Sequence, residues 1–386
     1  MIKKTPAWAR PRKVATPMFV LPAKSRIEPE PYGTTLIISP WNYPFQLLFN
    51  PIIGAVAAGN TVVCKPSEFV PQTTAISNEI IEKIFDPRHV SCVLGGIPES
   101  TALLAERWDY VFFTGSPKVG KIVYKAAAEH LTPVTLELGG KSPCIIDKTA
   151  NLDTTASRII FGKYINCGQT CIAPDYLFVH EDIKDKLIEK LKAKVKDFYG
   201  TDPQKSEDYG RIVNERHFDR VVHLIDESKV VFGGETDRVD KYIAPTFIDG
   251  VTKDDVIMQE EIFGPLLPIL TWNKLEEVKN FINDYEKPLV LYYFSKNKSN
   301  VEYILTHSSS GDACINDCLV QNANDNLPFG GVGESGIGSY HGKFSFDTFS
   351  HMKGVVYKAS GMDLPIRYAP WGKNYGKLKF LVDKTL

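Results

Sequence analysis

The residue best placed for chemistry is Cys171, which ends the run Gly168-Gln169-Thr170-Cys171. Gly168 suits the left-handed cap that ends many helices, and Pro174 discourages the helix from continuing. A cysteine just after such a stop is sterically available for nucleophilic attack. A single cysteine is nevertheless more often a small buried hydrophobic residue, and the chain has seven cysteines in all. The remainder of the sequence has to decide between these two interpretations.

Two more polar side chains stand at the ends of predicted strands. Glu137 precedes two glycines, which would let its carboxylate swing, and a carboxylate there could act as a base. Asn42 lies in Pro40-Trp-Asn-Tyr-Pro44, where its amide could donate to a developing oxyanion. Each has an ordinary alternative: a surface charge for the glutamate and a turn-forming role for the asparagine.

These residues require a scaffold, and the first third of the chain predicts one. Short β-branched runs alternate with amphipathic or small-residue apolar segments, separated by glycine and proline. The predicted strands are 34–39, 61–65, 90–94, 110–114 and 134–138, and the predicted helices are 49–58, 71–85, 99–108 and 118–130. Such alternation is typical of an α/β fold with a doubly wound parallel sheet.

The pattern resumes with longer helices after Gly139-Gly140. We therefore predict a dinucleotide-binding domain over residues 31–138 and a second α/β catalytic domain over 139–341. Proline-rich extended segments at 8–30 and 342–358 predict a β-arm for oligomerisation, the alternative for the first being a flexible leader.

Ligands of open parallel sheets bind beyond the carboxyl ends of the strands, which directs attention to two loops. Gly115 and Gly120 would let backbone approach a bulky group, and Ser116 is a good helix N-cap whose free neighbouring amides favour an anion. Lys65 and Glu68 follow the second strand, where dinucleotide folds hold the adenosine ribose. Together the two loops predict dinucleotide binding, although the GxGxxG fingerprint is absent.

Composition restricts the class of protein. The chain has 386 residues, 43% hydrophobic and 24% charged, with a net charge of −1. This composition is that of an ordinary globular protein and gives no reason to expect nucleic acid or an anionic membrane as a partner. Seven scattered cysteines without a metal-like cluster favour reduced thiols in the cytoplasm. No secretory signal, membrane helix or lipid anchor is recognisable, and no metal site is expected.

The motifs, taken in order, resemble those of the NAD(P)-dependent aldehyde dehydrogenases, and most closely their class 3 branch. The matching segments are Pro40-Trp-Asn-Tyr-Pro44, Lys65-Pro-Ser-Glu68, Phe113-Thr-Gly-Ser-Pro-Lys-Val-Gly120, Leu136-Glu-Leu-Gly-Gly140, Gly168-Gln-Thr-Cys171, Gln259-Glu-Glu-Ile-Phe-Gly-Pro265 and Leu327-Pro-Phe-Gly-Gly-Val-Gly333. The ending Gly338-Ser-Tyr-His-Gly-Lys343 with Phe349-Ser-His351 points to class 3.

The resemblance implies oxidation of an aldehyde to a carboxylic acid through a thiohemiacetal and a thioester on Cys171. Asn42 and the backbone N–H of Cys171 would hold the oxyanion, and Glu137 would activate the hydrolytic water. Glu261 would hold the nicotinamide ribose, with Phe263 and Phe329 near the nicotinamide ring. Lys65 and Glu68 would take the adenosine ribose of NAD or NADP, and Gly115, Ser116 and Gly120 would face the pyrophosphate.

Other expectations concern the substrate and the assembly. Tyr43, Phe161 and Tyr164 suggest an apolar, partly aromatic funnel for a medium-chain aliphatic or aromatic aldehyde. The resemblance further implies a homodimer. Class 3 members usually begin with a helical segment that is missing here. Two alternatives therefore stay open: an inactive or merely nucleotide-binding form, and a relative that passes the acyl group to coenzyme A or phosphate.

Overall fold

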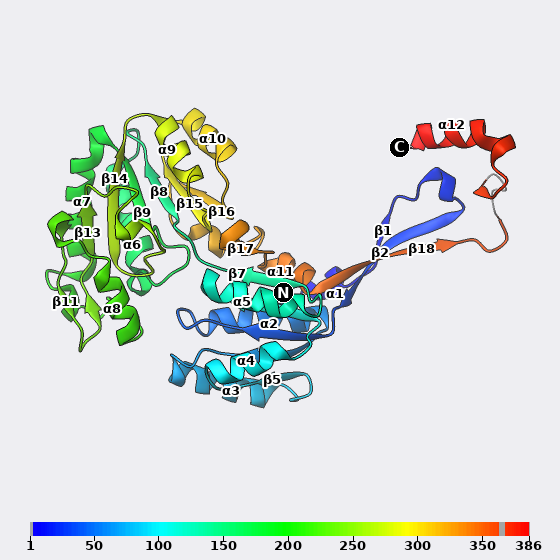
Figure 1. Cartoon of the computed structure of the whole chain (residues 1–386), viewed down its shortest axis with the longest axis horizontal. Coiled ribbons are helices and arrows are strands. Elements are labelled where there is room, and N and C mark those ends of the chain that lie inside the picture. The colour runs from blue at the N-terminus through cyan, green and yellow to red at the C-terminus, as the bar shows by residue number, and fades with distance from the viewer. Residues whose placement is uncertain (1–2, 363–366, 386) are drawn as a thin grey trace.

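The computed structural model describes residues 3–362 and 367–385, which form two lobes and a projecting arm (Figure 1). The first lobe contains a six-stranded sheet in the order β5-β4-β3-β6-β7-β17. Its strands are β3 Thr34–Ile38, β4 Thr61–Lys65, β5 Val90–Cys92, β6 Tyr110–Thr114, β7 Val134–Glu137 and β17 Gly336–Ile337. Strands β3 to β7 run parallel, as the alternating pattern predicts.

Four helices connect these strands: α2 Gln46–Ala58, α3 Pro71–Ile84, α4 Ile97–Ala105 and α5 Pro117–Ala128. Ser116 caps α5 by accepting a hydrogen bond from the Val119 N–H, at 3.4 Å. The doubly wound α/β fold expected from the sequence is therefore confirmed.

The last strand of this sheet comes from far along the chain. Strand β17 pairs antiparallel with β7, so that Gly336 lies opposite Glu137 and Ile337 opposite Leu136. Residues 336–337 had been assigned to the second domain from their sequence position. They lie instead on the edge of the first sheet, because pairing between distant segments has no local sequence signal.

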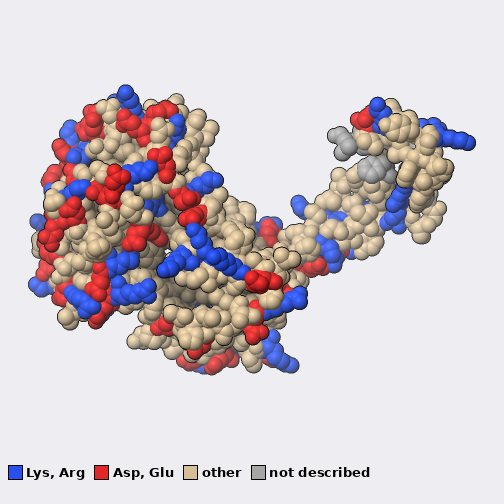
Figure 2. Space-filling model, in the orientation of Figure 1, with Lys and Arg blue, Asp and Glu red and all other residues tan. Residues whose placement is uncertain are grey.

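The second lobe contains a seven-stranded sheet in the order β10-β13-β14-β9-β8-β15-β16. Its strands are β8 Pro143–Ile146, β9 Tyr176–His180, β10 Val230–Phe232, β13 Thr246–Asp249, β14 Leu266–Trp272, β15 Val290–Phe294 and β16 Asp312–Ile315. The helices of this lobe are α6 Leu152–Tyr164, α7 Lys184–Tyr199, α8 Glu215–His223, α9 Leu275–Asn283 and α10 Lys298–His307, and a small hairpin joins β11 Thr236–Asp237 to β12 Tyr242–Ile243. Figure 2 shows acidic and basic side chains intermixed over this lobe.

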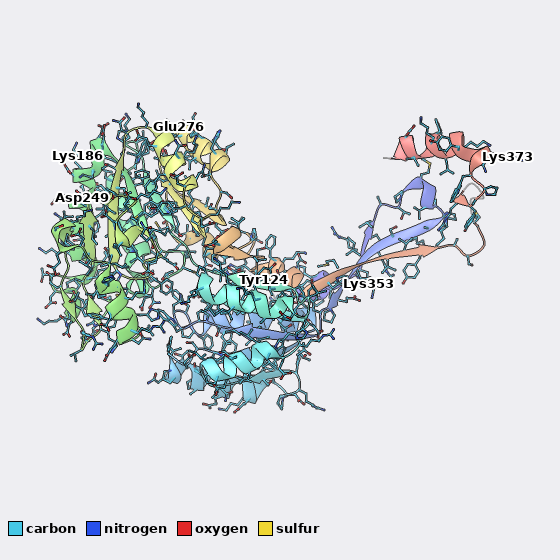
Figure 3. All side chains as sticks on the ribbon, viewed as in Figure 1. Tyr124, Lys186, Asp249, Glu276, Lys353 and Lys373 are labelled. Atoms are coloured by element: carbon cyan, nitrogen blue, oxygen red, sulfur yellow. The ribbon has the colours of Figure 1, made fainter. Side chains whose placement is uncertain are left out.

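The arm is a three-stranded antiparallel sheet that extends away from both lobes (Figure 1). It consists of β1 Arg12–Val14, β2 Ala23–Pro31 and β18 Ser350–Lys358, with β2 in the middle. Figure 3 labels Lys353 where β18 leaves the body, and this side chain forms an ion pair with Glu30 on β2. Helix α12 Tyr375–Thr385 lies near the tip of the arm.

The expected arm boundaries need one correction. Residues 342–348 are not extended, because Gly342–Thr348 forms helix α11, which packs on α2 of the first lobe. The arm proper on that side begins at Ser350. At the other end, the short helix α1 Thr5–Trp8 also lies against this region, with the Trp8 ring 6.0 Å from that of Phe346. No helix within the described ranges is both long and apolar enough to cross a membrane.

Candidate active site

A left-handed turn presents Cys171. Helix α6 ends at Tyr164, and the next residues form the 3-10 turn Ile165–Gly168. Within it Asn166, Cys167 and Gly168 have positive φ values of 50°, 56° and 75°. A Cβ atom at Gly168 would lie 2.3 Å from the Gly264 carbonyl oxygen, so only glycine fits there. The sequence predicted the helix stop at Gly168, but α6 ends four residues earlier, at Tyr164. Gly168 instead supplies the last left-handed position of the turn that leads to Cys171.

Gln169 holds this turn in place from inside the second lobe. Its Nε2 donates to the carbonyl oxygens of Asn166, at 3.0 Å, and Arg211, at 2.9 Å. Its Oε1 accepts from the Val213 N–H at 3.0 Å. The side-chain amide is thus bonded at both ends, which fixes the backbone two residues before Cys171.

Residues of the first lobe also form hydrogen bonds with this turn. The side-chain amide of Asn42 donates to the Gln169 carbonyl oxygen at 3.0 Å, and Asn166 Nδ2 donates to the Asn42 carbonyl oxygen at 2.8 Å. The Tyr43 hydroxyl lies 2.7 Å from the Thr170 hydroxyl. Each amide nitrogen carries two hydrogens, so Asn42 retains one donor for another acceptor. The loop after β3 and the loop after α6 are thereby joined across the boundary between the lobes.

Glu137 ends β7 and is buried, with 3% of its surface exposed. Neither carboxylate oxygen has a hydrogen-bond partner among the residues that the structure describes. Burial raises the pKa of Glu137 well above its ordinary value, and the nearby carboxylate of Asp312 adds to the shift. An acid buried without any partner costs folding free energy, which identifies this position as a functional candidate.

Cys171 and Glu137 line the same two cavities. The larger cavity is about 330 Å³, and the smaller is about 130 Å³. Thr114, Leu47 and Leu138 are the other residues shared by both. The Cys171 thiol and the Glu137 carboxylate therefore lie where the two cavities meet, although the two residues come from different lobes.

The larger cavity is mainly apolar. Tyr43, Phe161 and Phe329 are among its walls, together with Leu47, Ile165, Leu319, Val320, Ala323 and Tyr340. Tyr164, which was expected in this funnel, is not among them, and that expectation is corrected. Phe161 and Ile165 are four residues apart, at the end of α6, and therefore point to the same side, toward the cavity. Tyr164 points away from it into the second lobe, beside Tyr199 and Phe247.

The smaller cavity lies beside the loops expected to bind a cofactor. Its walls include Asn42, Gly115, Ser116, Phe263, Pro40, Trp41, Gly139 and His217. Phe329 was expected beside the same ligand as Phe263. The structure places the two rings in different cavities, Phe263 in the smaller and Phe329 in the larger.

The glycines of the Gly115–Gly120 loop differ in environment. Gly115 lies in the wall of the smaller cavity. Gly120 is buried in α5, where an added Cβ would lie 2.7 Å from the Leu138 side chain. Gly120 therefore allows close packing of α5 against the end of β7, and this contact replaces the direct approach to a ligand that the sequence suggested.

Lys65 and Glu68 meet at the carboxyl end of β4. Lys65 Nζ lies 3.1 Å from Glu68 Oε2 and 3.1 Å from the Pro66 carbonyl oxygen. The lysine side chain is buried, while that of Glu68 is 37% exposed. The pair thus presents one accessible carboxylate beside a buried ammonium group.

Glu261 and Phe263 belong to a loop that packs against Gly139-Gly140. A Cβ atom at Gly139 would lie 2.0 Å from Glu261 Oε2, so the glutamate carboxylate occupies the space that this glycine leaves free. Burial raises the pKa of Glu261 to about 8, with Asp175 acting in the same direction and a hydrogen bond from the Gly140 N–H opposing it. Phe263 has a φ of 47°, a left-handed conformation that the surroundings must enforce.

An anchor that the sequence analysis missed holds this loop. Lys141 and Asp175 form a buried ion pair. Lys141 Nζ also donates to the carbonyl oxygens of Ile257, at 3.0 Å, and Glu260, at 2.9 Å, and Asp175 accepts from the Ile262 N–H at 2.9 Å. Arg220 donates to the Ile262 carbonyl oxygen at 2.6 Å. We call Lys141, Asp175 and Arg220 the loop anchor.

Trp41 and His217 were also missed. Their rings lie 5.1 Å apart, and Trp41 meets Phe263 edge-on at 5.4 Å. The buried Nδ1 atom of His217 has no partner, and burial lowers the His217 pKa to about 4. Trp41 lies within the Pro40–Pro44 motif, which could have drawn attention to it. His217 follows Asn214, which caps α8, but a cap alone does not indicate a ligand.

Comparison with known proteins identifies the family of the chain. Residues 12–355 match the Aldehyde dehydrogenase family. The chain belongs to the aldehyde dehydrogenase family. It is 50% identical over 381 residues to the 4,4'-diaponeurosporen-aldehyde dehydrogenase of Staphylococcus aureus (strain NCTC 8325 / PS 47), covering 98% of this chain and 82% of that protein. It is 46% identical over 398 residues to rat aldehyde dehydrogenase family 3 member A2, covering 99% of this chain and 82% of that protein.

Solved structures of aldehyde dehydrogenases show the same fold. The substrate-bound state of Staphylococcus aureus AldH superposes with a TM-score of 0.96 at 49% identity, covering 98% of this chain and 83% of that one. The NAD-dependent aldehyde dehydrogenase of Sinorhizobium meliloti superposes with a TM-score of 0.85 at 32% identity, covering 94% of this chain and 73% of that one. The class 3 resemblance is confirmed, and the protein is an aldehyde dehydrogenase.

Proposed function

We propose that this aldehyde dehydrogenase oxidises an apolar aldehyde to its carboxylic acid with NAD(P)⁺ through covalent catalysis by Cys171. The observation that carries the proposal is the meeting of Cys171 with an unpartnered, buried Glu137 at the junction of two cavities. A nucleophile and a base are required at one point, with the aldehyde reaching it from one side and the cofactor from the other.

The smaller cavity has the chemistry to hold the reactive end of a dinucleotide. The buried oxygens of Glu137, the Thr114 hydroxyl and the Nδ1 atom of His217 lack partners there. Gly115 and Ser116 begin α5, whose free N–H groups suit a pyrophosphate. Glu261 would hold the nicotinamide ribose, Phe263 would pack near the ring, and Lys65 with Glu68 would hold the adenosine ribose. When bound, the oxidised cofactor supplies a hydride acceptor and a positive charge.

The thiol of Cys171 must lose its proton before it attacks. Burial raises the pKa of Cys171 to about 12, and the carboxylates of Glu261 and Glu137 act in the same direction. The thiolate is therefore disfavoured in the protein alone, so the reactive state requires added positive charge in the smaller cavity. Thiol alkylation tests this point, because NAD⁺ should accelerate modification of Cys171 and an unchanged rate would contradict it.

The remaining steps use residues that surround the sulfur. Attack of the thiolate on the aldehyde carbon forms a thiohemiacetal, whose oxyanion accepts from the remaining Asn42 N–H and the backbone N–H of Cys171. Loss of hydride leaves a thioester on Cys171. Glu137 accepts a proton from water as that water attacks the thioester, and the carboxylic acid is released. Burial raises the pKa of Glu137, which makes its carboxylate a stronger base than an ordinary one.

The walls of the larger cavity indicate the substrate class. They are apolar and partly aromatic, with Phe161 half exposed at the protein surface. Medium-chain aliphatic and aromatic aldehydes fit such a wall. The Staphylococcus aureus relative is named as a 4,4'-diaponeurosporen-aldehyde dehydrogenase. For the cofactor, the exposed carboxylate of Glu68 favours NAD over NADP by repelling a 2′-phosphate, although one rat relative is named as NADP-preferring.

Absorbance of NADH at increasing concentrations of hexanal and benzaldehyde tests the proposed activity, with NADP⁺ in a parallel series. We expect turnover with both aldehydes and a higher kcat/KM with NAD⁺. Addition of coenzyme A or phosphate should leave the rate unchanged, because Glu137 serves hydrolysis. A rate that depends on coenzyme A would instead support an acylating enzyme, and cofactor binding without turnover would support an inactive form.

The arm favours a homodimer. Its outer strands β1 and β18 have unpaired edges, and Val14, Met352, Val356 and Tyr357 expose apolar surface on them. Exposed strand edges of this kind pair with another chain, and a second copy offers the same edges. Light scattering at micromolar concentration should give twice the mass of one chain, and a monomer would reject this assembly.

All seven cysteines are free, which fits a reducing compartment such as the cytoplasm.

A further inference from the structure

Two pairs of cysteines lie in thiol contact outside the proposed catalytic residues. The side chains of Cys64 and Cys92 interact in the first lobe, and those of Cys144 and Cys318 interact in the second. All four are free thiols. Neither pair lines either of the two cavities that meet at Cys171.

The first pair has the backbone geometry of a potential disulfide. Cys64 on β4 and Cys92 on β5 are direct partners in the parallel register of the sheet. Neighbouring strands lie about 4.8 Å apart, and Cα atoms joined by a disulfide are usually about 4.4 to 6.8 Å apart. The existing contact between the thiols shows that both side chains point to the same face, so a bond requires no change of register.

Access and charge distinguish the two sulfur atoms. Strand β5 is the edge of the sheet, and Cys92 is partly exposed, whereas Cys64 is fully buried. The hydrogen bond from Cys64 lowers the pKa of Cys92, and Lys65 contributes in the same direction. The same contact, together with burial, raises the pKa of Cys64. Cys92 is thus the more accessible of the two sulfurs and the one that loses its proton more readily.

We propose that Cys64 and Cys92 form an oxidisable dithiol that hydroperoxides convert to a disulfide in the folded enzyme. The Cys92 thiolate attacks one oxygen of hydrogen peroxide: an S–O bond forms, the O–O bond breaks, and the leaving hydroxide takes a proton to become water. Cys64 then loses its proton and attacks the Cys92 sulfur, so an S–S bond forms and a second water leaves. Two thiols are oxidised and one peroxide is reduced to two waters.

The position of the pair gives the oxidation a consequence for the enzyme. Lys65 follows Cys64 directly, and the Cys64 carbonyl oxygen accepts from the Val93 N–H at 2.8 Å. A bond between the sulfurs draws β5 toward β4 beside Lys65 and Glu68. If these residues hold the adenosine ribose, as the proposed function states, oxidation weakens cofactor binding by about threefold or more.

Peroxide titration followed by differential alkylation and peptide mass spectrometry tests the proposal on the full chain. We expect a cross-linked peptide pair containing Cys64 and Cys92, lost on treatment with dithiothreitol. Cys144 and Cys318 provide an internal control, because their thiols touch but both residues are buried. Those two should remain reduced under conditions that oxidise more than half of the first pair.

Two variants complete the test. Cys92→Ser should leave Cys64 unmodified by peroxide, and Cys64→Ser should allow Cys92 to accumulate as a sulfenic acid that dimedone traps. The proposal is overturned if Cys64 and Cys92 remain reduced while Cys171 oxidises, or if Cys144 and Cys318 cross-link equally well.

The effect on cofactor binding is measured separately, by NADH fluorescence titration in a Cys171→Ser background. This background removes the nucleophile, so peroxide cannot act through it. The oxidised form should bind NADH about threefold more weakly than the reduced form, and Cys92→Ser in the same background should show no change with peroxide. Cross-linking without a change in affinity would reject the adenosine site at Lys65 and Glu68 but leave the dithiol intact.

Discussion

Two buried carboxylates close to the candidate active site have opposite surroundings. Asp175, in the loop anchor, has an ammonium partner in Lys141 and accepts from the Ile262 N–H at 2.9 Å. Glu137, at the cavity junction, has no partner for either oxygen. Folding satisfies the first group and leaves the second group unsatisfied, at a cost in stability. Asp175 thus supports the loop that bears Glu261 and Phe263, whereas Glu137 is left open to a group that binds later, in keeping with the role proposed for it.

Of the substitutions considered, removal of the nucleophile should lower the catalytic rate most. Cys171→Ala is expected to lower kcat by roughly 10³-fold or more, because no other group at the junction can form the thioester. Steady-state NADH absorbance measures the loss. Cys314→Ala is a matched control, since Cys314 is buried on β16 and lines neither cavity, and its rate should stay close to that of the unmodified enzyme. Substantial turnover by Cys171→Ala would refute the assignment of the junction.

Neutralising the unpartnered carboxylate separates activity from stability. Glu137→Gln should lower kcat by about 10²- to 10⁴-fold, because water loses its base. The pKa of Glu137 is higher in the folded protein than in the unfolded chain, so folding favours the protonated acid. The free energy of unfolding is therefore highest at low pH and falls as the pH rises through the folded-state pKa. The variant should therefore unfold at a higher temperature than the parent at pH 9, and the difference should shrink toward pH 5. Differential scanning calorimetry at both pH values measures the unfolding temperatures. A variant less stable than the parent at pH 9 would mean that the Glu137 carboxylate has stabilising partners in the folded protein.

The partnered carboxylate should behave in the opposite way. Asp175→Asn leaves the Lys141 ammonium buried without its counter-charge and is expected to cost about 3 to 5 kcal/mol of unfolding free energy. The KM for NAD⁺ should rise more than kcat falls, because the loop bearing Glu261 and Phe263 loses its support. Urea unfolding and initial rates give the two quantities. Arg220→Lys, which keeps the charge but not the fork of donors to the loop, should show a smaller change in the same direction.

The smallest effect is that of pH on the unmodified enzyme. Burial raises the pKa of Cys171 to about 12 and that of Glu137 well above its ordinary value, so a higher pH favours the deprotonated forms that the reaction requires. The rate should therefore increase as the pH rises above 7, by about tenfold per pH unit for a group that is still mostly protonated. In Glu137→Gln the residual rate should depend on pH through the thiol alone. An identical pH profile for parent and variant would contradict a role for Glu137 as the base.

Much of the first lobe could be predicted from local sequence. The five parallel strands β3 to β7 lie where β-branched runs predicted them, whereas α6 ends at Tyr164, four residues before the stop that the sequence predicted at Gly168. In the second lobe the sequence predicts strands at 177–179, 289–294 and 313–316 and helices at 152–166, 184–198, 216–227 and 275–285. Strands β8 and β14 and helix α10 are not among them. Strands β8 and β14 contain proline, which local patterns count against a strand, although neighbouring strands bury both of them.

By itself the sequence determined the order of strands and helices in the first lobe, the α/β class, the family and the residue types able to react, because these depend on short periodic patterns and contiguous motifs. Tertiary structure alone decided that Gly120 packs on Leu138, that Phe329 and Phe263 face different cavities and that Lys141 meets Asp175. It also brought Gly336 beside Glu137. These relations join residues that are distant in the chain or turn side chains toward one of several neighbours, and the free energy that selects them comes from packing and burial across the whole molecule rather than from any local segment.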